Sequence, residues 1–313
     1  MSSSSLVLIT GATSGIGEAL AHRYATLGHR LALVARREDA LQTVLSALPT
    51  HPAGHCAYAA DVRNAPDMAQ VAQRCIERQG LPDIVIANAG ISAGVDTAEA
   101  DDLLILRNII ETNVLGIAHT FSPFLAAMRA RASGVLVGIS SVAGIRGLPG
   151  HGAYCASKAA AITYCESLRG ELRGTGVSVV TICPGYVRTP LTEHNGFHMP
   201  FLMSAQAFAA QAVPCIAARK SYQVIPWPMA IIARILHILP NAVFDRLAQR
   251  LPASHVPGLA GHQGNQCLRS RCRSDGSREG CTRQKKACIL CAPSTHQKKR
   301  PTRGRLYYVD ERG

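Results

Sequence analysis

Residues 6–17 read Leu6-Val7-Leu8-Ile9-Thr10-Gly11-Ala12-Thr13-Ser14-Gly15-Ile16-Gly17, and this stretch decides the fold. A short apolar run, typical of a buried strand, passes directly into a glycine cluster at which a helical pattern begins. Glycines permit a tight turn, and the free N–H groups and dipole of a helix N-terminus attract phosphate oxygens. The stretch therefore predicts a strand, a turn and a helix that together bind a nucleotide phosphate.

The same alternation of short apolar runs and longer helical patterns continues to about residue 190, which is typical of βαβ units and a parallel sheet. We predict strands at Leu6–Thr10, Arg30–Ala35, His55–Ala60, Asp83–Ala87, Gly134–Ser140, Ser178–Cys183 and Tyr222–Ile225. We predict helices at Gly17–Leu27, Asp39–Leu48, Pro66–Gln79, Asp101–Arg131, Gly152–Arg173 and Ala205–Ala218. The fold class is thus α/β, a doubly wound parallel sheet in a single domain.

Charge divides the chain into two parts. The sequence is 47% hydrophobic with a net charge of +13, but residues 253–313 hold 13 lysines and arginines against four acidic residues. Apolar periodicity also stops near Pro252, so we predict a folded domain at 1–252 and a poorly ordered basic tail at 253–313. Three other interpretations of the tail stay open: a zinc site at Cys288-x-x-Cys291, electrostatic binding to nucleic acid or anionic lipid, and translation out of the ancestral frame.

The cellular location is predicted from the N-terminus and the cysteines. The N-terminus lacks the basic region and the long apolar run of a signal peptide, and the cysteines before Pro252 lack paired spacing. We therefore expect a cytoplasmic protein with reduced thiols. Residues 224–240 are apolar but interrupted by prolines, Arg234 and His237, so they predict either a peripheral membrane contact or a helix that covers the substrate.

Tyr154 and Lys158 are four residues apart in a predicted helix and follow Ser141 by thirteen and seventeen residues. Side chains four apart share one helix face, so the phenol and the ammonium stand together. A phenol titrates near pH ~10, and a neighbouring positive charge makes it a stronger acid. The pair predicts a general acid.

The end of the second predicted strand indicates the cofactor. An acidic residue there binds a ribose 2′-hydroxyl, whereas a basic one pairs with a 2′-phosphate. This sequence has Arg36 and Arg37 at that point, and we therefore expect NADP(H) in preference to NAD(H).

Several ordered motifs resemble those of the classical short-chain dehydrogenase/reductase family over about residues 5–225. Thr10–Gly17 resembles its cofactor loop, Asp61-Val62 its adenine-binding pair, and Asn88-Ala89-Gly90 its Asn-Asn-Ala-Gly segment, with Ala87 in place of the first asparagine. Pro184–Thr189 resembles the segment that closes over the nicotinamide. The family's catalytic positions fall on Asn113, Ser141, Tyr154 and Lys158.

The resemblance implies a Rossmann-type fold and a role for each residue. Tyr154 donates or accepts the substrate proton, Lys158 lowers the pKa of Tyr154 and holds the nicotinamide ribose, and Ser141 binds the substrate oxygen. Asn113 holds a water that links Lys158 to solvent. Ser140 competes with Ser141, but the spacing to Tyr154 favours Ser141. The implied cofactor-binding residues are Gly11, Thr13, Ser14, Gly15, Ile16, Gly17, Arg36, Arg37, Asp61, Val62, Asn88, Ala89, Gly90, Tyr154, Lys158, Pro184, Gly185, Val187 and Thr189.

The implied activity is the interconversion of a carbonyl and a secondary alcohol, without a metal. An apolar substrate lid at about 190–220 favours a hydrophobic substrate. The family also implies a homodimer or homotetramer through the helices that begin near Asp101 and Gly152. The alternative hypothesis is a nicotinamide-binding sensor or scaffold whose tail contacts nucleic acid or membrane, and of these two partners nucleic acid is the less expected.

Overall fold

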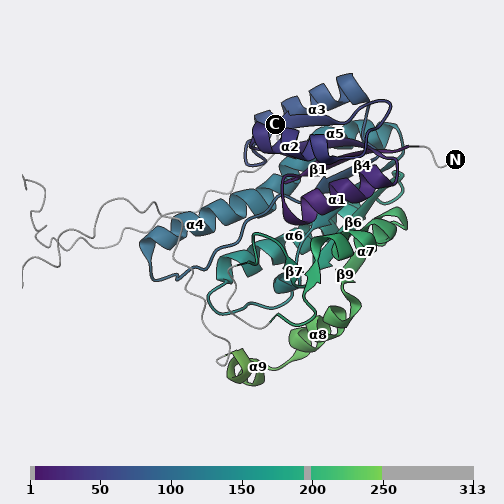
Figure 1. The fold of residues 1–313 in the computed structure, drawn as a ribbon. Coiled ribbons are helices and arrows are strands. Elements are labelled where there is room, and N and C mark those ends of the chain that lie inside the picture. Colours follow the sequence, from purple (N-terminus) through teal and green to yellow (C-terminus); the bar gives the residue numbers. More distant parts are fainter. Residues whose placement is uncertain (1–3, 194–198, 249–313) are drawn as a thin grey trace, which may run out of the picture. The chain divides into compact units, whose positions relative to one another are not determined.

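A computed structural model describes residues 4–193 and 199–248 of the chain. Its centre is a seven-stranded parallel sheet in the order β3-β2-β1-β4-β5-β6-β9 (Figure 1). The strands are β1 (Leu6–Thr10), β2 (Arg30–Ala35), β3 (Cys56–Ala59), β4 (Ile84–Ala87), β5 (Gly134–Ile139), β6 (Val177–Pro184) and β9 (Tyr222–Ile225). The predicted fold class is confirmed, with strand ends within one residue of those expected.

Helices cover both faces of this sheet because its strands are apolar on both faces. Successive side chains of a strand point to opposite faces, so Val7 and Ile9 enter one core while Leu6 and Leu8 enter the other. The first core is closed by α1 (Gly15–Thr26), α2 (Glu38–Ala47) and α7 (Ala205–Ala217). The second is closed by α3 (Ala65–Gln79), α5 (Gly116–Ala130) and α6 (Gly152–Glu171).

The single helix expected over Asp101–Arg131 is three segments. An α-helix, α4 (Ala100–Ile110), passes into a π-helical turn, η1 (Glu111–Leu115), and then into α5. A π-turn carries one residue more than an α-helical turn, and such turns are frequent at functional sites. Asn113 lies at the middle of this turn and is fully buried.

Two further helices follow the last strand. They are α8 (Trp227–Ile238) and α9 (Asn241–Ala248). Helix α8 lies within residues 224–240, for which the sequence predicts a membrane contact or a covering helix, and α9 directly follows them. Helix α8 has 12 residues, and no helix in the described ranges is long and apolar enough to cross a membrane. A two-stranded ribbon of β7 (Val187–Arg188) and β8 (Met203–Ser204) was not predicted; β7 precedes the expected lid and β8 lies within it.

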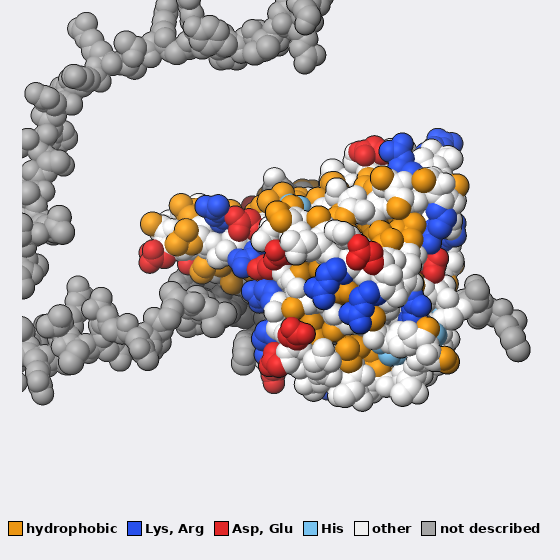
Figure 2. Space-filling model, turned by 90° about the horizontal axis from the view of Figure 1, so that it is seen from above, with side chains coloured by type: hydrophobic (Ala, Val, Ile, Leu, Met, Phe, Trp, Pro, Cys, Tyr) orange, Lys and Arg blue, Asp and Glu red, His pale blue; other side chains and the backbone are white. Residues whose placement is uncertain are grey.

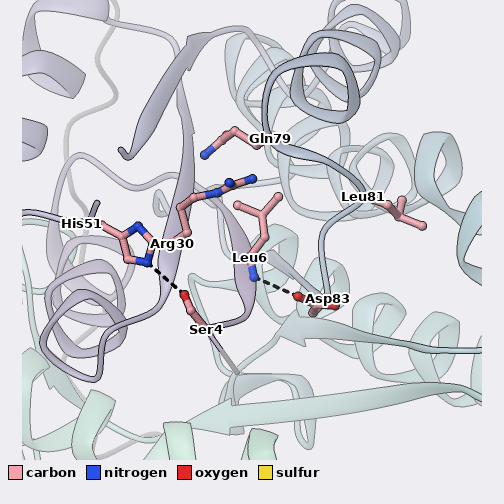
Figure 3. A pocket seen from close by; sticks show the side chains of 7 residues that line it. All are labelled: Ser4, Leu6, Arg30, His51, Gln79, Leu81 and Asp83. Carbon is pink, nitrogen blue, oxygen red and sulfur yellow. Dashed lines mark hydrogen bonds between the residues drawn. The ribbon is translucent and has the colours of Figure 1, made fainter. Parts of the chain in front are cut away.

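A cavity of about 360 Å³ lies at the amino ends of the strands (Figure 3). The Leu6 N–H donates to Asp83 Oδ2 over 2.9 Å, and Ser4 Oγ lies 3.0 Å from His51 Nε2. Arg131 contacts the other oxygen of Asp83 at 3.3 Å. These contacts attach the start of β1 to Asp83, which precedes β4, and Ser4 to His51, which precedes β3. Ser4, Leu6, His51 and Asp83 are among the residues that line the cavity.

Some sequence predictions lie outside the described residues. They are the prediction that the 253–313 tail is poorly ordered, the possible zinc site at Cys288 and Cys291, and residues 194–198 of the expected lid. The proposed domain boundary at Pro252 also lies beyond the last described residue, Ala248.

Candidate active site

The glycine loop between β1 and α1 is packed so closely that side chains are excluded from it. A Cβ atom on Gly11 would lie 2.8 Å from Ala89 Cα, and one on Gly15 would lie 3.0 Å from Thr189 Cγ2. A Cβ on Gly17 would collide with the Gly11 carbonyl oxygen and with Asn88 Nδ2. Gly11 and Gly15 also have positive φ angles, of 65° and 58°, which glycine adopts without strain. The loop therefore joins the residues after β1, β4 and β6 at one place.

Asn88 and Thr10 hold this loop in position. Asn88 Nδ2 donates to the carbonyl oxygens of Thr10 and Gly11, over 3.0 and 3.2 Å. The Thr10 hydroxyl in turn accepts from the N–H groups of Asn88 and Ala89, over 3.1 and 3.2 Å. The predicted Asn88-Ala89-Gly90 segment is thus part of the same site as the glycine loop.

The N-terminus of α1 is suited to an anion. Its N-cap, Ser14, makes no side-chain hydrogen bond to the first turn, whereas α7 is capped by Ser204 Oγ, which accepts from Ala207 N over 3.1 Å. The first N–H groups of a helix need a partner, and the dipole favours a negative one. The excluded side chains and this uncapped end fit the diphosphate of a dinucleotide.

Asp61 and Arg36 lie together at the ends of the neighbouring strands β3 and β2. Asp61 accepts from Arg63, whose Nη2 lies 2.6 Å from Asp61 Oδ2. This hydrogen bond, and more weakly the charge of Arg36, lowers the pKa of the Asp61 carboxyl. Arg36 and Arg37 are both exposed, and Arg37 is the N-cap of α2. Two arginines are therefore accessible beside the position predicted for the adenosine ribose.

Tyr154 and Lys158 share one face of α6, as their spacing predicts. Lys158 Nζ lies 5.7 Å from the centroid of the Tyr154 ring and donates to the Ile139 carbonyl oxygen over 3.1 Å. Burial lowers the pKa of Lys158 to about 8 and raises the pKa of Tyr154 to about 12, although a hydrogen bond with Ser141 acts to lower the latter. The loss of solvation outweighs the hydrogen bond with Ser141, so the pKa of Tyr154 lies above its ordinary value, and the predicted lowering by Lys158 stays a prediction.

Ser141, rather than Ser140, is the serine available to a ligand. The Ser140 hydroxyl donates to the Lys158 carbonyl oxygen over 2.7 Å and so holds α6 to β5. Ser141 Oγ accepts from the Ala143 N–H over 3.1 Å, and its hydroxyl is directed at the phenol of Tyr154. The pKa effect on Tyr154 places Ser141 beside the phenol.

Asn113 joins the π-turn to the segment after β4 and to α6 through hydrogen bonds. Its Oδ1 accepts from Ile91 N over 2.8 Å, and its Nδ2 donates to the Ile91 carbonyl oxygen and to Ser157 Oγ, both over 2.9 Å. A Cβ on Gly90 would lie 3.3 Å from Asn113 Oδ1 and 3.4 Å from Lys158 Nζ. The π-turn therefore brings Asn113 to the residues around Lys158. Its predicted role in holding a water stays a prediction.

Helix α8 adds an apolar wall. Val142, which follows Ser141, and Tyr186, which follows Gly185, pack against buried Cys183, Val224 and Met229. A Cβ on Gly185 would lie 2.8 Å from Met229 Cγ. The inner face of α8 thus contacts both segments that flank the predicted substrate position.

The cysteines near this site are packing residues. Cys155 and Cys183 are buried, and burial raises the pKa of each thiol, which disfavours the nucleophilic thiolate. The six cysteines within the described ranges are all free thiols. In the same ranges, no group of three His, Cys, Asp or Glu side chains is placed to hold a metal ion.

Sequence reasoning missed several residues that support the site. They share hydrogen bonds to predicted site residues or to the helices beside them: Arg63, Arg146 and Ser157. Ser157 lies within the Tyr154–Lys158 motif, and its spacing from Tyr154 could have suggested a shared face. The contacts of Arg146 and Asn113 join residues far apart in sequence, so no local signal indicates them.

A parallel doubly wound sheet with a glycine-rich phosphate cradle and a Ser-Tyr-Lys cluster at its carboxyl edge defines a nicotinamide-dependent oxidoreductase. Comparison with known proteins specifies the family. The family model described as "short chain dehydrogenase" matches residues 5–198. The chain belongs to the short-chain dehydrogenase/reductase family, whose members act on CH–OH groups with NAD(P).

Individual relatives agree with this assignment. An "Uncharacterized oxidoreductase" of Myxococcus xanthus is 40% identical over 244 residues, which cover 78% of this chain and 96% of that protein. A short-chain dehydrogenase/reductase from Burkholderia phymatum, solved in complex with NAD, is 26% identical with a TM-score of 0.67 and covers 80% of this chain and 97% of its own. One from Sphingobium yanoikuyae, solved with NADPH, is 26% identical with a TM-score of 0.62 and covers 76% and 97%.

Proposed function

We propose that this protein reduces a hydrophobic carbonyl compound with NADPH, or oxidises the corresponding secondary alcohol, with Tyr154 as the general acid or base. The observation that carries this proposal is the convergence of Ser141, Tyr154 and Lys158 beside the glycine loop. The bound nicotinamide supplies the hydride.

In the direction of reduction, the substrate oxygen accepts hydrogen bonds from Ser141 and Tyr154. As the carbonyl carbon receives the hydride, the phenol of Tyr154 gives its proton to the oxygen, and an alcohol and a phenolate result. A pKa of about 12 keeps Tyr154 protonated at neutral pH and therefore ready to donate. Lys158 stabilises the phenolate until a proton returns from solvent.

The apolar wall supports a hydrophobic substrate. Val142, Tyr186 and Met229 present carbon atoms on the side of the site that α8 closes, and apolar walls of this kind bind ligands through burial of their hydrocarbon surface. Sugar-like substrates, by contrast, require several polar partners in the site.

A carbonyl panel tests the reaction. We expect NADPH oxidation with straight-chain and aromatic ketones or aldehydes, with kcat/KM rising as the chain lengthens, and little with polyhydroxylated carbonyls of similar size. Tight NADPH binding without turnover of any compound would contradict the proposal and favour the sensor alternative.

Arg36 supports the preference for NADP(H). It is exposed and lies close enough to Asp61, the residue predicted to bind the adenine, to lower the pKa of that carboxyl, and this proximity supports a contact with the 2′-phosphate. A charge-assisted hydrogen bond contributes roughly 1.5–3 kcal/mol, so Arg36→Asp should reduce the NADPH over NADH preference by about 10- to 100-fold. Arg173→Asp makes the same charge change at an exposed residue after α6 and should leave the ratio unchanged. A wild-type preference for NADH would overturn this assignment.

Exposed leucines on α4 support a homo-oligomer. Leu103 and Leu104 are 51% and 63% exposed, and in the view of Figure 2 hydrophobic side chains lie among charged ones on α4, at the left. We propose that a second copy covers this helix. Light scattering should show a dimer or tetramer that Leu104→Asp dissociates, and a wild-type monomer would contradict the proposal.

A further inference from the structure

Helix α8 is apolar on two opposite faces. Met229 and Ala233 are buried against the domain, whereas Trp227, Ile231, Ile235 and Ile238 are 69%, 50%, 51% and 78% exposed. The exposed residues follow one another at intervals of four, four and three, which places them along one stripe of the helix. A helix that is apolar on both sides is normally covered on both. In the described part of the chain, the outer stripe is left in contact with solvent.

Helix α9 also exposes apolar side chains. Val243 and Leu247 are four residues apart and 44% and 51% exposed, whereas Phe244 is buried. We call the six exposed residues of the two helices the outer apolar face: Trp227, Ile231, Ile235, Ile238, Val243 and Leu247.

Arg146 fixes the two helices to each other. Its Nη1 donates to the carbonyl oxygens of Leu236 and Leu239, over 3.0 and 2.9 Å, and its Nη2 donates to Asn241 Oδ1 over 2.8 Å. The guanidinium also lies 4.4 Å from the centroid of the Phe244 ring. Arg146, in the loop that follows Ser141, therefore holds the end of α8 and the start of α9 in a defined position.

The charged residues of these two helices are mostly positive. Helices α8 and α9 carry Arg234 and Arg246 against one acidic residue, Asp245. In the sequence after α9, residues 253–313 hold 13 basic residues against four acidic ones. In the helix, Arg234 is one turn from Ile231 and Ile238, beside the apolar stripe. A second copy of the same face would bring like charges together, whereas a surface of anionic headgroups complements them.

We propose that the outer apolar face binds the surface of an anionic lipid bilayer. The aliphatic side chains enter the boundary between headgroups and acyl chains, Trp227 lies at the headgroup level, and the arginines contact lipid phosphates. The helices lie on the bilayer and do not cross it. This binding is independent of the reaction proposed above, because Trp227, Ile231 and Ile235 are directed away from the apolar wall of the site.

Trp227 is the only tryptophan of the chain, so its fluorescence reports on this face alone. Full-length protein should show a blue shift of its emission, and quenching by brominated acyl chains, when mixed with phosphatidylcholine vesicles that contain phosphatidylglycerol. Pure phosphatidylcholine vesicles should give a much smaller effect, and high salt should weaken binding to the anionic ones.

Ile235→Asp should weaken vesicle binding about tenfold or more, because burial of an isoleucine is lost and a charge is added that repels the headgroups. Ile76→Asp makes the same change at an exposed position of α3, 37% accessible, and should bind vesicles like the wild type. Circular dichroism of both variants confirms that they fold, and the wild-type emission tests the proposal without any substitution.

Several results would overturn the proposal. They are an unshifted Trp227 emission in vesicles that sediment the protein, an equal shift with both lipids, and a shift that survives Ile235→Asp. A blue shift that grows with protein concentration in the absence of lipid would identify a second copy as the occupant. An emission already blue-shifted at every concentration, and unchanged by lipid, would identify the chain's own C-terminal segment. The carbonyl panel tests the proposed reaction separately, so none of these lipid-binding results decides whether the protein is an oxidoreductase for such compounds.

Discussion

Strand β4 has Asp83 directly before it and Asn88 directly after it, and both side chains bind the main chain near β1. Asp83 accepts from the Leu6 N–H, which leaves the start of β1 fully paired. Asn88 instead donates to the carbonyl oxygens of Thr10 and Gly11, so the N–H groups at the start of α1 still lack a side-chain cap. The polar contacts at the amino end of the sheet stabilise the fold, whereas those at the carboxyl end hold a surface ready for a ligand.

The strongest test of this comparison is Tyr154→Phe. The ring is kept and the proton donor is lost, so we expect kcat for carbonyl reduction to fall about a thousandfold, within the usual range for general acids. NADPH affinity and the unfolding midpoint should change little. Steady-state kinetics and cofactor titration measure both, and turnover close to that of the wild type would refute the assigned role.

A pair of glycine substitutions comes next. Gly17→Ala would bring a Cβ against the Gly11 carbonyl oxygen and Asn88, and the loop must move, which we expect to weaken NADPH binding at least about tenfold and to cost roughly 1–3 kcal/mol of stability. Gly170→Ala, in α6, meets no atom within 4 Å and should stabilise the protein by up to about 1 kcal/mol, with unchanged affinity. Equal NADPH affinity of the two variants would contradict the proposal that the glycine loop binds the cofactor.

The pH dependence of reduction should follow Lys158. Its pKa is lowered to about 8, so the ammonium is lost as the pH rises through that value, while Tyr154 keeps its proton to about pH 12. We expect kcat/KM to be level below about pH 8 and to fall about tenfold per pH unit above it, as one ionisation requires. Lys158→Arg, which stays charged, should remove this fall whatever its absolute rate. A wild-type kcat/KM that stays level to about pH 10 would rule out a requirement for the charged form of Lys158.

The smallest effect on activity is expected at the amino end. Asp83→Ala removes the acceptor of the Leu6 N–H and should lower the free energy of unfolding by about 1 kcal/mol, because its partly exposed ion pair with Arg131 adds little. Cofactor affinity and kcat should be unchanged. Asp61→Ala at the carboxyl end should show the converse, weaker NADPH binding with little loss of stability. Urea titration and cofactor binding separate the two, and a kcat defect in Asp83→Ala would break the comparison.

Much of the fold follows from local patterns. The strands were predicted to within a residue because apolar runs between turn residues are local signals, and the glycine loop and the Tyr154–Lys158 pair are short enough to be recognised by spacing. The π-turn around Asn113 that divides the long helix was not predicted, because such a turn has no characteristic amino-acid composition. The hydrogen bonds of Arg146 to α8 join residues some ninety positions apart, and only the folded chain brings them together.

The direction of the Tyr154 pKa also required the structure. Sequence spacing shows that a lysine stands beside the phenol, but it gives no measure of how far burial removes both groups from water. The choice between Ser140 and Ser141 could be made from the sequence, because the spacing to Tyr154 favours Ser141, and the hydrogen-bond partners of the two hydroxyls add the physical reason.

The π-turn at Glu111–Leu115 has a consequence for the phase of the helix that contains it. Each residue advances a helix by about 100°, so one additional residue rotates everything before the turn by that angle relative to everything after it. Leu103 and the buried Phe121 are eighteen residues apart, which is five turns of a regular α-helix, so they would share one stripe of a regular helix; the π-turn places them about 100° apart. Deleting a single residue between Glu111 and Leu115 would make the helix regular, and the same deletion would turn α4 about its axis and move Leu103 and Leu104 to another side of the molecule.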